Sequence, residues 1–141
     1  MQENFPKEER LKSLKKIQKV IREGKIVRFG TIKICWMMIS TEPENNQPCS
    51  LQIKAGFSVP KKRIKHAVKR NQIRRKMKEI FRLNKAPFYS IIPKGQQLIL
   101  FFIYQNNEIL PYKKIETDLL SAIKRIQDIL TKRQKDNSYK F

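Results

Sequence analysis

The stretch AGFSVPKKRIKHAVKRNQIRRKMKEIFRL, residues 55–83, decides the fold of this chain. A short apolar run leads to Pro60, and a basic segment with the spacing of an amphipathic helix follows it. Residues 61–82 contain eleven Lys or Arg side chains and one acid, Glu79. Because such a density of positive charge repels itself unless a polyanion lies against it, the stretch predicts a nucleic-acid partner.

The composition of the whole chain agrees with this interpretation. Its 141 residues carry a net charge of +20 and 40% hydrophobic residues, which predict one domain over residues 1–141 with one core. The first residues are too polar for a secretion signal, and the apolar run 98–104 is too short to span a bilayer. With Cys35 and Cys49 as the two cysteines, we expect free thiols in a cytoplasmic protein without a membrane partner.

Hydrophobic spacing and turn residues predict the order of the elements. Apolar residues three or four apart predict helices, and alternation or a short apolar run predicts a strand. The expected elements are a helix at 5–23, a strand at 26–39, a hairpin loop at 41–50, the returning strand at 51–59, a helix at 65–83, a connector at 85–95, a buried strand at 97–104, a helix at 112–131 and a frayed basic tail at 132–141. A further short strand at 26–28 is compatible with the pattern. The order α-β-β-(β)-α-β-α predicts an α+β sandwich of helices against a small sheet.

The central helix at 65–83 separates apolar side chains from basic ones. Its apolar stripe consists of Ile73, Met77, Ile80 and Phe81. Four basic side chains step by four residues along the flank of this stripe: Arg70, Arg74, Lys78 and Arg82. An arginine can hold a phosphate through two parallel hydrogen bonds, so the flank predicts phosphate contacts in preference to a merely solvated surface.

A resemblance to a known family is carried by two adjoining segments, GFSVPKK at 56–62 and AVKRNQIRR at 67–75. Together they resemble the signature of the protein subunit of bacterial ribonuclease P. The segment RLKSLKKIQKVIREG at 10–24 is also similar to the first helix of that family. The similarity in element order and length covers nearly the whole chain.

The resemblance implies both a fold and a role. The fold is an α+β domain with a left-handed βαβ crossover. The role is to assist a catalytic RNA that removes the 5′ leader from precursor tRNA, so the implied partners are that RNA subunit and precursor tRNA, without an obligate protein partner. The implied metal is magnesium for the RNA-catalysed reaction, with no cofactor bound by the protein alone.

The resemblance also assigns residues by position. Those expected to contact the RNA subunit are Lys65, Arg70, Asn71, Gln72, Arg74 and Arg75. Those expected around a cleft for the leader are Ile17 and Ile21 in its wall, Cys35 or Trp36 in its floor, and Ser58, Lys61 and Lys62 at its edge.

The sequence departs from the family pattern at two places. Gln72 stands where the family has a second arginine, and Ile17 and Ile21 are aliphatic where the wall is usually aromatic. Trp36 is either a substitute stacking surface or a core residue, and the two isoleucines are either cleft wall or core.

An independent nuclease site has little support in the sequence. Such a site needs clustered carboxylates for metal ions, or a nucleophile with a base. The aspartates Asp118, Asp128 and Asp136 all lie in the last quarter, and the sole histidine, His66, lies in a basic run. We therefore expect no catalytic residue and no metal site, and an inactive protein in the absence of the RNA.

Three functions compete on these observations. The first is the RNA-binding subunit of ribonuclease P, the second is a ribosomal protein or RNA assembly factor without a role in tRNA processing, and the third is a protein-only nuclease. The signature at 67–75 favours the first over the second, and the missing acidic cluster argues against the third.

Overall fold

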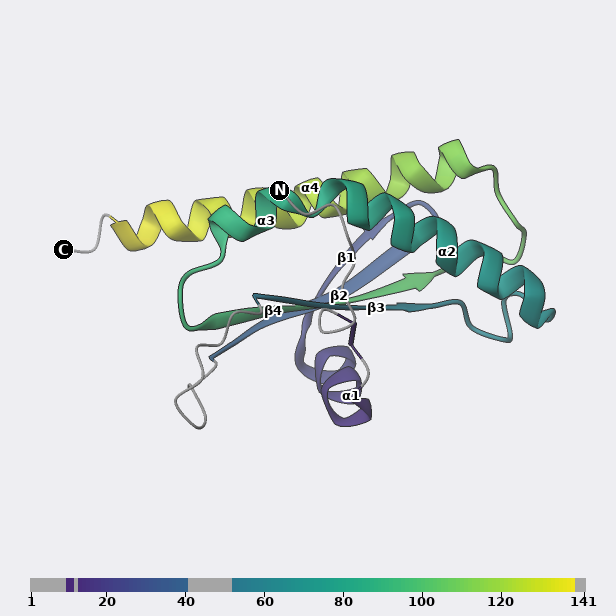
Figure 1. Cartoon of the computed structure of the whole chain (residues 1–141), viewed down its shortest axis with the longest axis horizontal. Helices are drawn as coiled ribbons and strands as arrows, with labels where there is room; N and C mark the ends of the chain where they lie inside the picture. Colours follow the sequence, from purple (N-terminus) through teal and green to yellow (C-terminus); the bar gives the residue numbers. More distant parts are fainter. Residues whose placement is uncertain (1–9, 12, 41–51, 139–141) are drawn as a thin grey trace.

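The computed structural model describes residues 10–11, 13–40 and 52–138, with side chains up to residue 133. Figure 1 shows its elements, which are α1 (Leu14–Glu23), β1 (Lys25–Phe29), β2 (Ile32–Ser40), β3 (Ile53–Ser58), α2 (Ala67–Asn84), α3 (Ala86–Ile91), β4 (Gln96–Tyr104) and α4 (Tyr112–Ser138). The expected α+β fold is confirmed, and so is the further short strand, which is β1.

The sheet has the strand order β1-β2-β4-β3. β4 pairs antiparallel with β2 and parallel with β3. The predicted hairpin between the second and third strands is therefore wrong, because β4 lies between them; residues 41–51 themselves lie outside the described residues. The run QLILFFIY explains this position, since a strand that is apolar on both faces is most stable where both neighbours and both faces are covered.

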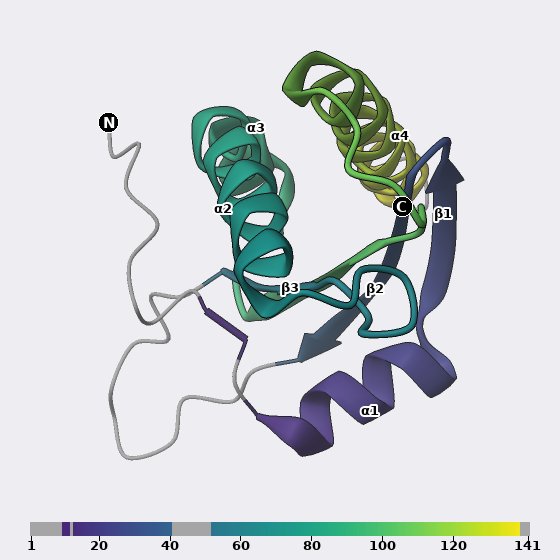
Figure 2. The ribbon, with the colours of Figure 1, turned by 90° about the vertical axis from the view of Figure 1, so that its right-hand side faces the viewer.

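The connection from β3 to β4 passes through α2 and α3 and is left-handed. Viewed from α2 with both strands pointing up, β4 lies to the left of β3 (Figures 1 and 2). About 98% of such crossovers are right-handed, so general rules of chain geometry would have predicted the opposite hand. The hand that the family resemblance implied is the one observed.

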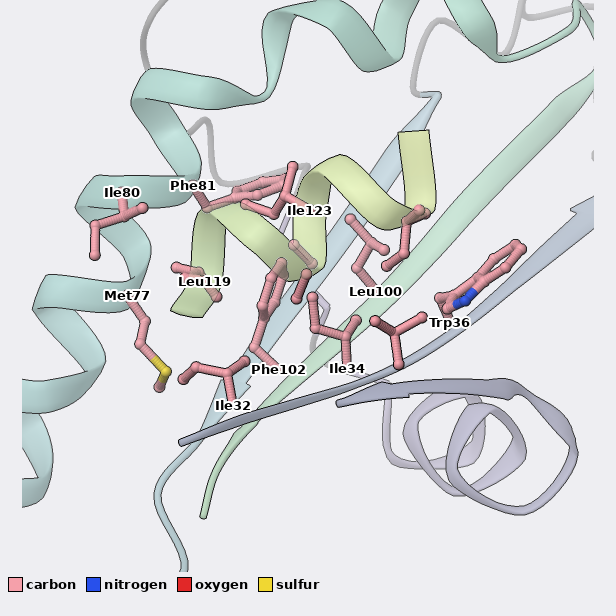
Figure 3. Packing of buried hydrophobic residues seen from close by; sticks show 14 of the residues in the cluster. Ile32, Ile34, Trp36, Met77, Ile80, Phe81, Leu100, Phe102, Leu119 and Ile123 are labelled. Atoms are coloured by element: carbon pink, nitrogen blue, oxygen red, sulfur yellow. The ribbon is translucent and has the colours of Figure 1, made fainter. Parts of the chain in front are cut away.

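Helices cover the two faces of the sheet unequally. α2, α3 and α4 lie on one face, and α1 lies on the other (Figure 2). The larger core lies under the three helices, where Trp36, Leu100 and Phe102 of the strands meet Phe81 of α2 and Ile123 of α4 (Figure 3). A smaller core lies under α1 and contains Leu11, Val20, Cys35 and Ile99.

The central helix follows the sequence closely. His66 is the residue before its first turn, and the four residues of the predicted apolar stripe are all buried. The segment before it turns back at Pro60, whose carbonyl accepts hydrogen bonds from the backbone N–H groups of Arg63 and Ile64. This turn buries Ile64 and leads into α2, which begins beyond the end of β3 (Figure 1).

Three element boundaries differ from the expectation. α1 begins at Leu14, because the hydroxyl of Ser13 caps it by accepting a hydrogen bond from the backbone N–H of Lys16. The predicted connector at 85–95 contains the short helix α3, with Pro87 in its first turn, where proline is compatible with a helix. The tail predicted to fray from residue 132 is helical to Ser138, since α4 continues past the buried Leu130.

Candidate nucleic-acid interface

Arg70 is the residue of α2 that fixes the preceding segment. Its Nη1 atom donates hydrogen bonds to the carbonyl oxygens of Ile64 and Lys65, at 2.9 and 2.8 Å. The side chain is half-buried, so part of the guanidinium is engaged within the protein while the rest stays accessible. Arg70 therefore supports the loop as well as contributing charge to the surface.

Further along the same flank, Arg74 and Asn71 contact each other. Nη2 of Arg74 donates a hydrogen bond of 2.5 Å to Oδ1 of Asn71. Nε of Arg74 is buried and has no hydrogen-bond partner within the described part of the chain. The predicted residues Lys65, Gln72 and Arg75 are exposed on the first turns of α2 or just before it. The six residues predicted to contact RNA thus all lie in the first half of α2 or just before it, and none of them is fully buried.

This basic surface continues to the outer edge of β3. There a pocket of about 260 Å³ is lined by Arg10, Arg74 and Lys78 together with Leu11 and residues 55–57. Partial burial lowers the pKa of Lys78, and the charges of Arg10, Arg74 and Arg75 lower it further. These cations repel one another, so a phosphate at this edge would relieve the repulsion.

Arg10 and Lys78 are not among the residues that the resemblance assigned to a site. Lys78 had a signal in the sequence, because it continues the four-residue step of Arg70 and Arg74. Arg10 had none. It reaches the edge because the backbone N–H of Leu11 donates a 2.8 Å hydrogen bond to the carbonyl of Ala55, a pairing between distant segments.

A second basic pocket, of about 450 Å³, lies between the start of α2 and the loop after β4. Lys65, His66 and Lys69 line it on one side, and Asn107 and Glu108 on the other. A hydrogen bond of 3.2 Å from Arg63 to Asn107 holds the two segments together. Lys65 and His66 thus share one surface with the exposed N-terminus of a long helix, whose dipole also favours anions.

The second group of predicted residues lies on the opposite face of the sheet, around α1. Val20 is fully buried against the strands, Ile17 is half-buried, and Ile21 is 44% exposed. Leu14, one turn before Ile17, is 67% exposed. Residues 14, 17 and 21 therefore make an apolar flank of α1 that is only partly covered.

The strands provide a floor beside this flank. In the strand register Cys35 of β2 lies beside Phe101 of β4, which lies beside Gly56 of β3, and Ser58 is two residues further along β3. Successive residues of a strand point to opposite faces, so Cys35 and Ser58 share the face of α1. Burial raises the pKa of the Cys35 thiol, although Lys33 and Arg28 act in the opposite direction.

Trp36 does not belong to this floor. It points to the opposite face, is 1% exposed and packs in the larger core, with the guanidinium of Arg133 5.2 Å from its ring centre (Figure 3). The prediction that Trp36 contributes to a leader cleft is therefore wrong, and the reason is the alternation of the strand. Of the two cysteines, Cys35 is a free thiol, and Cys49 lies outside the described residues.

Lys61 and Lys62 lie between the two groups. Both are exposed in the turn that follows β3. The lysine pair therefore follows the edge strand β3, at the end of a sheet that carries α2 on one face and α1 on the other (Figure 2).

Neither a metal-binding cluster nor a membrane-spanning helix occurs among the described residues. They contain no group of three or more His, Cys, Asp or Glu side chains that could hold a metal ion. None of the helices in the described part of the chain is long and apolar enough to cross a membrane.

The sequence is similar to known proteins over most of its length. The family described as Ribonuclease P matches residues 5–127. The ribonuclease P protein component of Finegoldia magna is 40% identical over 72 residues, which are 51% of this chain and 58% of that protein. The corresponding protein of Porphyromonas gingivalis is 28% identical over 121 residues, which are 85% of this chain and 84% of that protein.

Solved structures share the fold. The RNase P protein of Staphylococcus aureus has a TM-score of 0.60 at 21% identity, over 84% of this chain and 94% of that chain. The RNase P protein of Thermotoga maritima has a TM-score of 0.59 at 23% identity, over 83% of this chain and 96% of that chain. With a family match that spans residues 5–127, this chain belongs to the ribonuclease P family of proteins.

Proposed function

We propose that this chain is the protein subunit of a bacterial ribonuclease P, which binds the catalytic RNA and assists the removal of the 5′ leader from precursor tRNA. The observation that carries the proposal is the signature segment at 56–75 in a chain that matches the family over residues 5–127. The relatives named above bear the same name, ribonuclease P protein component.

The start of α2 is the proposed contact with the RNA subunit. The exposed residues Lys65, Gln72 and Arg75 would meet the RNA first. Arg70 and Arg74 would add charge while holding the loop and Asn71 in place. Such a surface neutralises phosphates, so binding should weaken steeply as salt rises.

The face of the sheet beside α1 is the proposed site of the leader. Ile17 and Ile21 would form one wall, the buried Cys35 would lie beneath the floor, and Ser58, Lys61 and Lys62 would lie at the open end. Apolar groups beside lysines suit a single strand of RNA, whose bases are apolar on their flat faces and whose backbone is charged.

In this proposal the catalytic RNA carries the cleavage, and magnesium is needed by that RNA. The protein contributes position and charge. The magnitude of that contribution should be greatest at low magnesium, where fewer ions neutralise the RNA.

The test is cleavage of a precursor tRNA at low magnesium by a cognate catalytic RNA, with and without the protein. We expect the protein to raise the rate of leader removal, and we expect no cleavage by protein that has been freed of RNA. An absent stimulation would favour a ribosomal or assembly role, and cleavage by RNA-free protein would favour a protein nuclease.

A further inference from the structure

We infer that Phe101 is the stacking surface on which a leader base rests, and that this chain therefore places its aromatic contact in the floor of the leader site. The inference rests on the proposed function and names the residue against which a base of the single-stranded leader stacks at that site.

Phe101 is the aromatic residue that the sheet offers to this face. Among the described residues that the four strands direct toward α1, no other side chain is aromatic. The helix itself, with the sequence LKKIQKVIRE, has no aromatic residue. A base that stacks at this face therefore has Phe101 as its aromatic partner.

The ring of Phe101 is supported from below but not enclosed. It packs against the small core of Leu11, Val20, Cys35 and Ile99, yet it remains partly exposed. A fixed ring keeps a stacking surface in one place, so less motion is lost when a base binds.

Gly56 explains how the ring reaches this position. A Cβ atom at residue 56 would lie 3.0 and 3.2 Å from the Cδ1 and Cε1 atoms of the Phe101 ring. A side chain at residue 56 would thus require the Phe101 ring or a neighbouring atom to shift by a few tenths of an ångström. Glycine at this position lets the aromatic ring lie close to the backbone of β3.

The charges around the ring fit a nucleic-acid strand. Arg28, Lys33 and Lys54 belong to the same face of the strands. The described strand residues on this face include no acid. A single strand of RNA could therefore place a base on Phe101 and its phosphates near cations, whereas an acidic peptide would leave the ring unused.

The experiment measures the affinity of the reconstituted complex for precursor tRNA relative to mature tRNA. Phe101→Leu keeps an apolar side chain and removes the ring, and Phe101→Trp keeps an aromatic ring. Phe29→Leu is the matched control, because Phe29 is also partly exposed but lies on the opposite face of the sheet.

We expect Phe101→Leu to lower the ratio of the affinity for precursor tRNA to that for mature tRNA by roughly five-fold or more. This factor corresponds to the lower end of the free energy that stacking contributes per base. Phe101→Trp and Phe29→Leu should keep the ratio of the unchanged protein. In a precursor whose leader nucleotides lack bases, the Phe101→Leu effect should disappear. An unchanged ratio in Phe101→Leu overturns the inference.

A fluorescence measurement tests whether a leader base stacks at residue 101 even if Phe101→Leu does not fold. The emission of the tryptophan in Phe101→Trp should be quenched by precursor tRNA and unaffected by the precursor with the base-free leader, because Trp36 is buried on the other face. If the tryptophan emission of Phe101→Trp does not change when precursor tRNA is added, the inference is wrong. A complex of the unchanged protein without any preference for precursor overturns the proposed leader site itself, and the inference with it.

Discussion

Arg70 combines two tasks in one side chain. Its two hydrogen bonds to the carbonyls of Ile64 and Lys65 hold the segment that leads into α2, and its charge faces the surface proposed for RNA. Arg75 has only the second task among the contacts that the structure describes, since it is exposed and five residues further along the helix. A comparison of variants at the two arginines therefore distinguishes the support of the segment before α2 from the contribution of charge.

We predict that Arg70→Ala and Arg75→Ala both weaken RNA binding, because each removes one positive charge. The two variant proteins should differ in their stability toward unfolding. Each should reduce the slope of log affinity against log salt by about one unit or less if it contacts one phosphate. Arg70→Ala should also lower the free energy of unfolding by about 1–2 kcal/mol, because two carbonyls lose a charged donor. Salt-dependent binding and urea unfolding of both variants test this. Equal stabilities would mean that the loop does not depend on Arg70.

Asp118 of α4 fixes the turn between β1 and β2. Its Oδ2 atom accepts hydrogen bonds of 2.9 Å from both the backbone N–H and the hydroxyl of Thr31, and Oδ1 accepts one of 3.2 Å from Lys114. The turn leaves no room for a side chain at Gly30, which has a φ of +55° and lies against this carboxylate.

The pKa of Asp118 follows from opposing effects. Burial raises the pKa of this carboxyl, but the hydrogen bonds from Thr31 and the nearby Lys114 outweigh burial and hold the pKa below its ordinary value. A carboxyl with a lowered pKa stabilises the fold above its unfolded pKa, near 4, and loses that contribution as the pH falls through the folded value.

We predict that Asp118→Asn lowers the free energy of unfolding at pH 7 by about 1–3 kcal/mol, because the two donors of Thr31 lose a charged acceptor. The difference from the unchanged protein should shrink as the pH falls below about 4, where the carboxylate becomes protonated. Urea unfolding as a function of pH measures both. A difference that stays constant down to pH 2–3 would show that the charge of Asp118 is not the cause.

At the scale of elements, α1 turns one side toward the core and leaves a neighbouring flank partly open. Val20 is fully buried, and Ile21, next in the chain, is 44% exposed. The angle of about 100° between consecutive helix residues produces this difference. It allows stability and leader binding to be tested on adjacent residues.

We predict that Val20→Ala lowers the free energy of unfolding by about 2 kcal/mol and that Ile21→Ala lowers it by markedly less, since a half-exposed side chain loses less burial. Ile21→Ala, like Ile17→Ala, should instead reduce the preference for precursor over mature tRNA. Thermal melting of the variants, together with the affinities of the reconstituted complex for precursor and for mature tRNA, tests this prediction. If Ile21→Ala unfolds like a core variant and keeps the preference, the leader must lie elsewhere.

The elements differ in how far the sequence predicts them. The stripe of Ile73, Met77, Ile80 and Phe81 specifies α2 because burial and helical spacing agree there. The order of the strands was not predictable in this way, because β2 and β3 are close in sequence and only long-range pairing sets them on either side of β4. The hand of the crossover came from the resemblance alone.

The candidate site was predicted unevenly for the same reason. Residues on one helix, such as Arg70, Arg74 and Arg75, are placed together by their spacing. Phe101 was missed because its membership of the face under α1 depends on the register between β4 and its neighbours. Trp36 was misassigned because the resemblance placed it by sequence position alone, whereas the alternation along β2 decides the face of the sheet on which it lies.

For the molecule as a whole, the net charge of +20 is the dominant electrostatic fact. Without RNA this charge opposes the compact state, and dissolved salt screens the repulsion. One place where this repulsion acts is the edge of β3, where Arg10, Arg74 and Lys78 line the same pocket.

We predict that the melting temperature of the free protein rises when NaCl is increased from about 50 mM to about 500 mM. Lys78→Gln should raise the melting temperature at low salt and reduce its salt dependence. Lys124→Gln, at an exposed position of α4, is the control and should change either quantity less. Thermal melts of the three proteins provide the measurement, and destabilisation by Lys78→Gln at low salt would contradict the prediction.

The pairing of Leu11 with Ala55 has a consequence for self-association. β3 is the outermost strand, and the hydrogen bond from the backbone N–H of Leu11 occupies part of its free edge. A sheet edge with unpaired backbone groups is a template for another chain. A protein that began at Ser13 would present that edge uncovered, with the apolar residues of β3 behind it. The pairing of Leu11 with Ala55 therefore leaves less of the β3 edge free to pair with a strand of another chain.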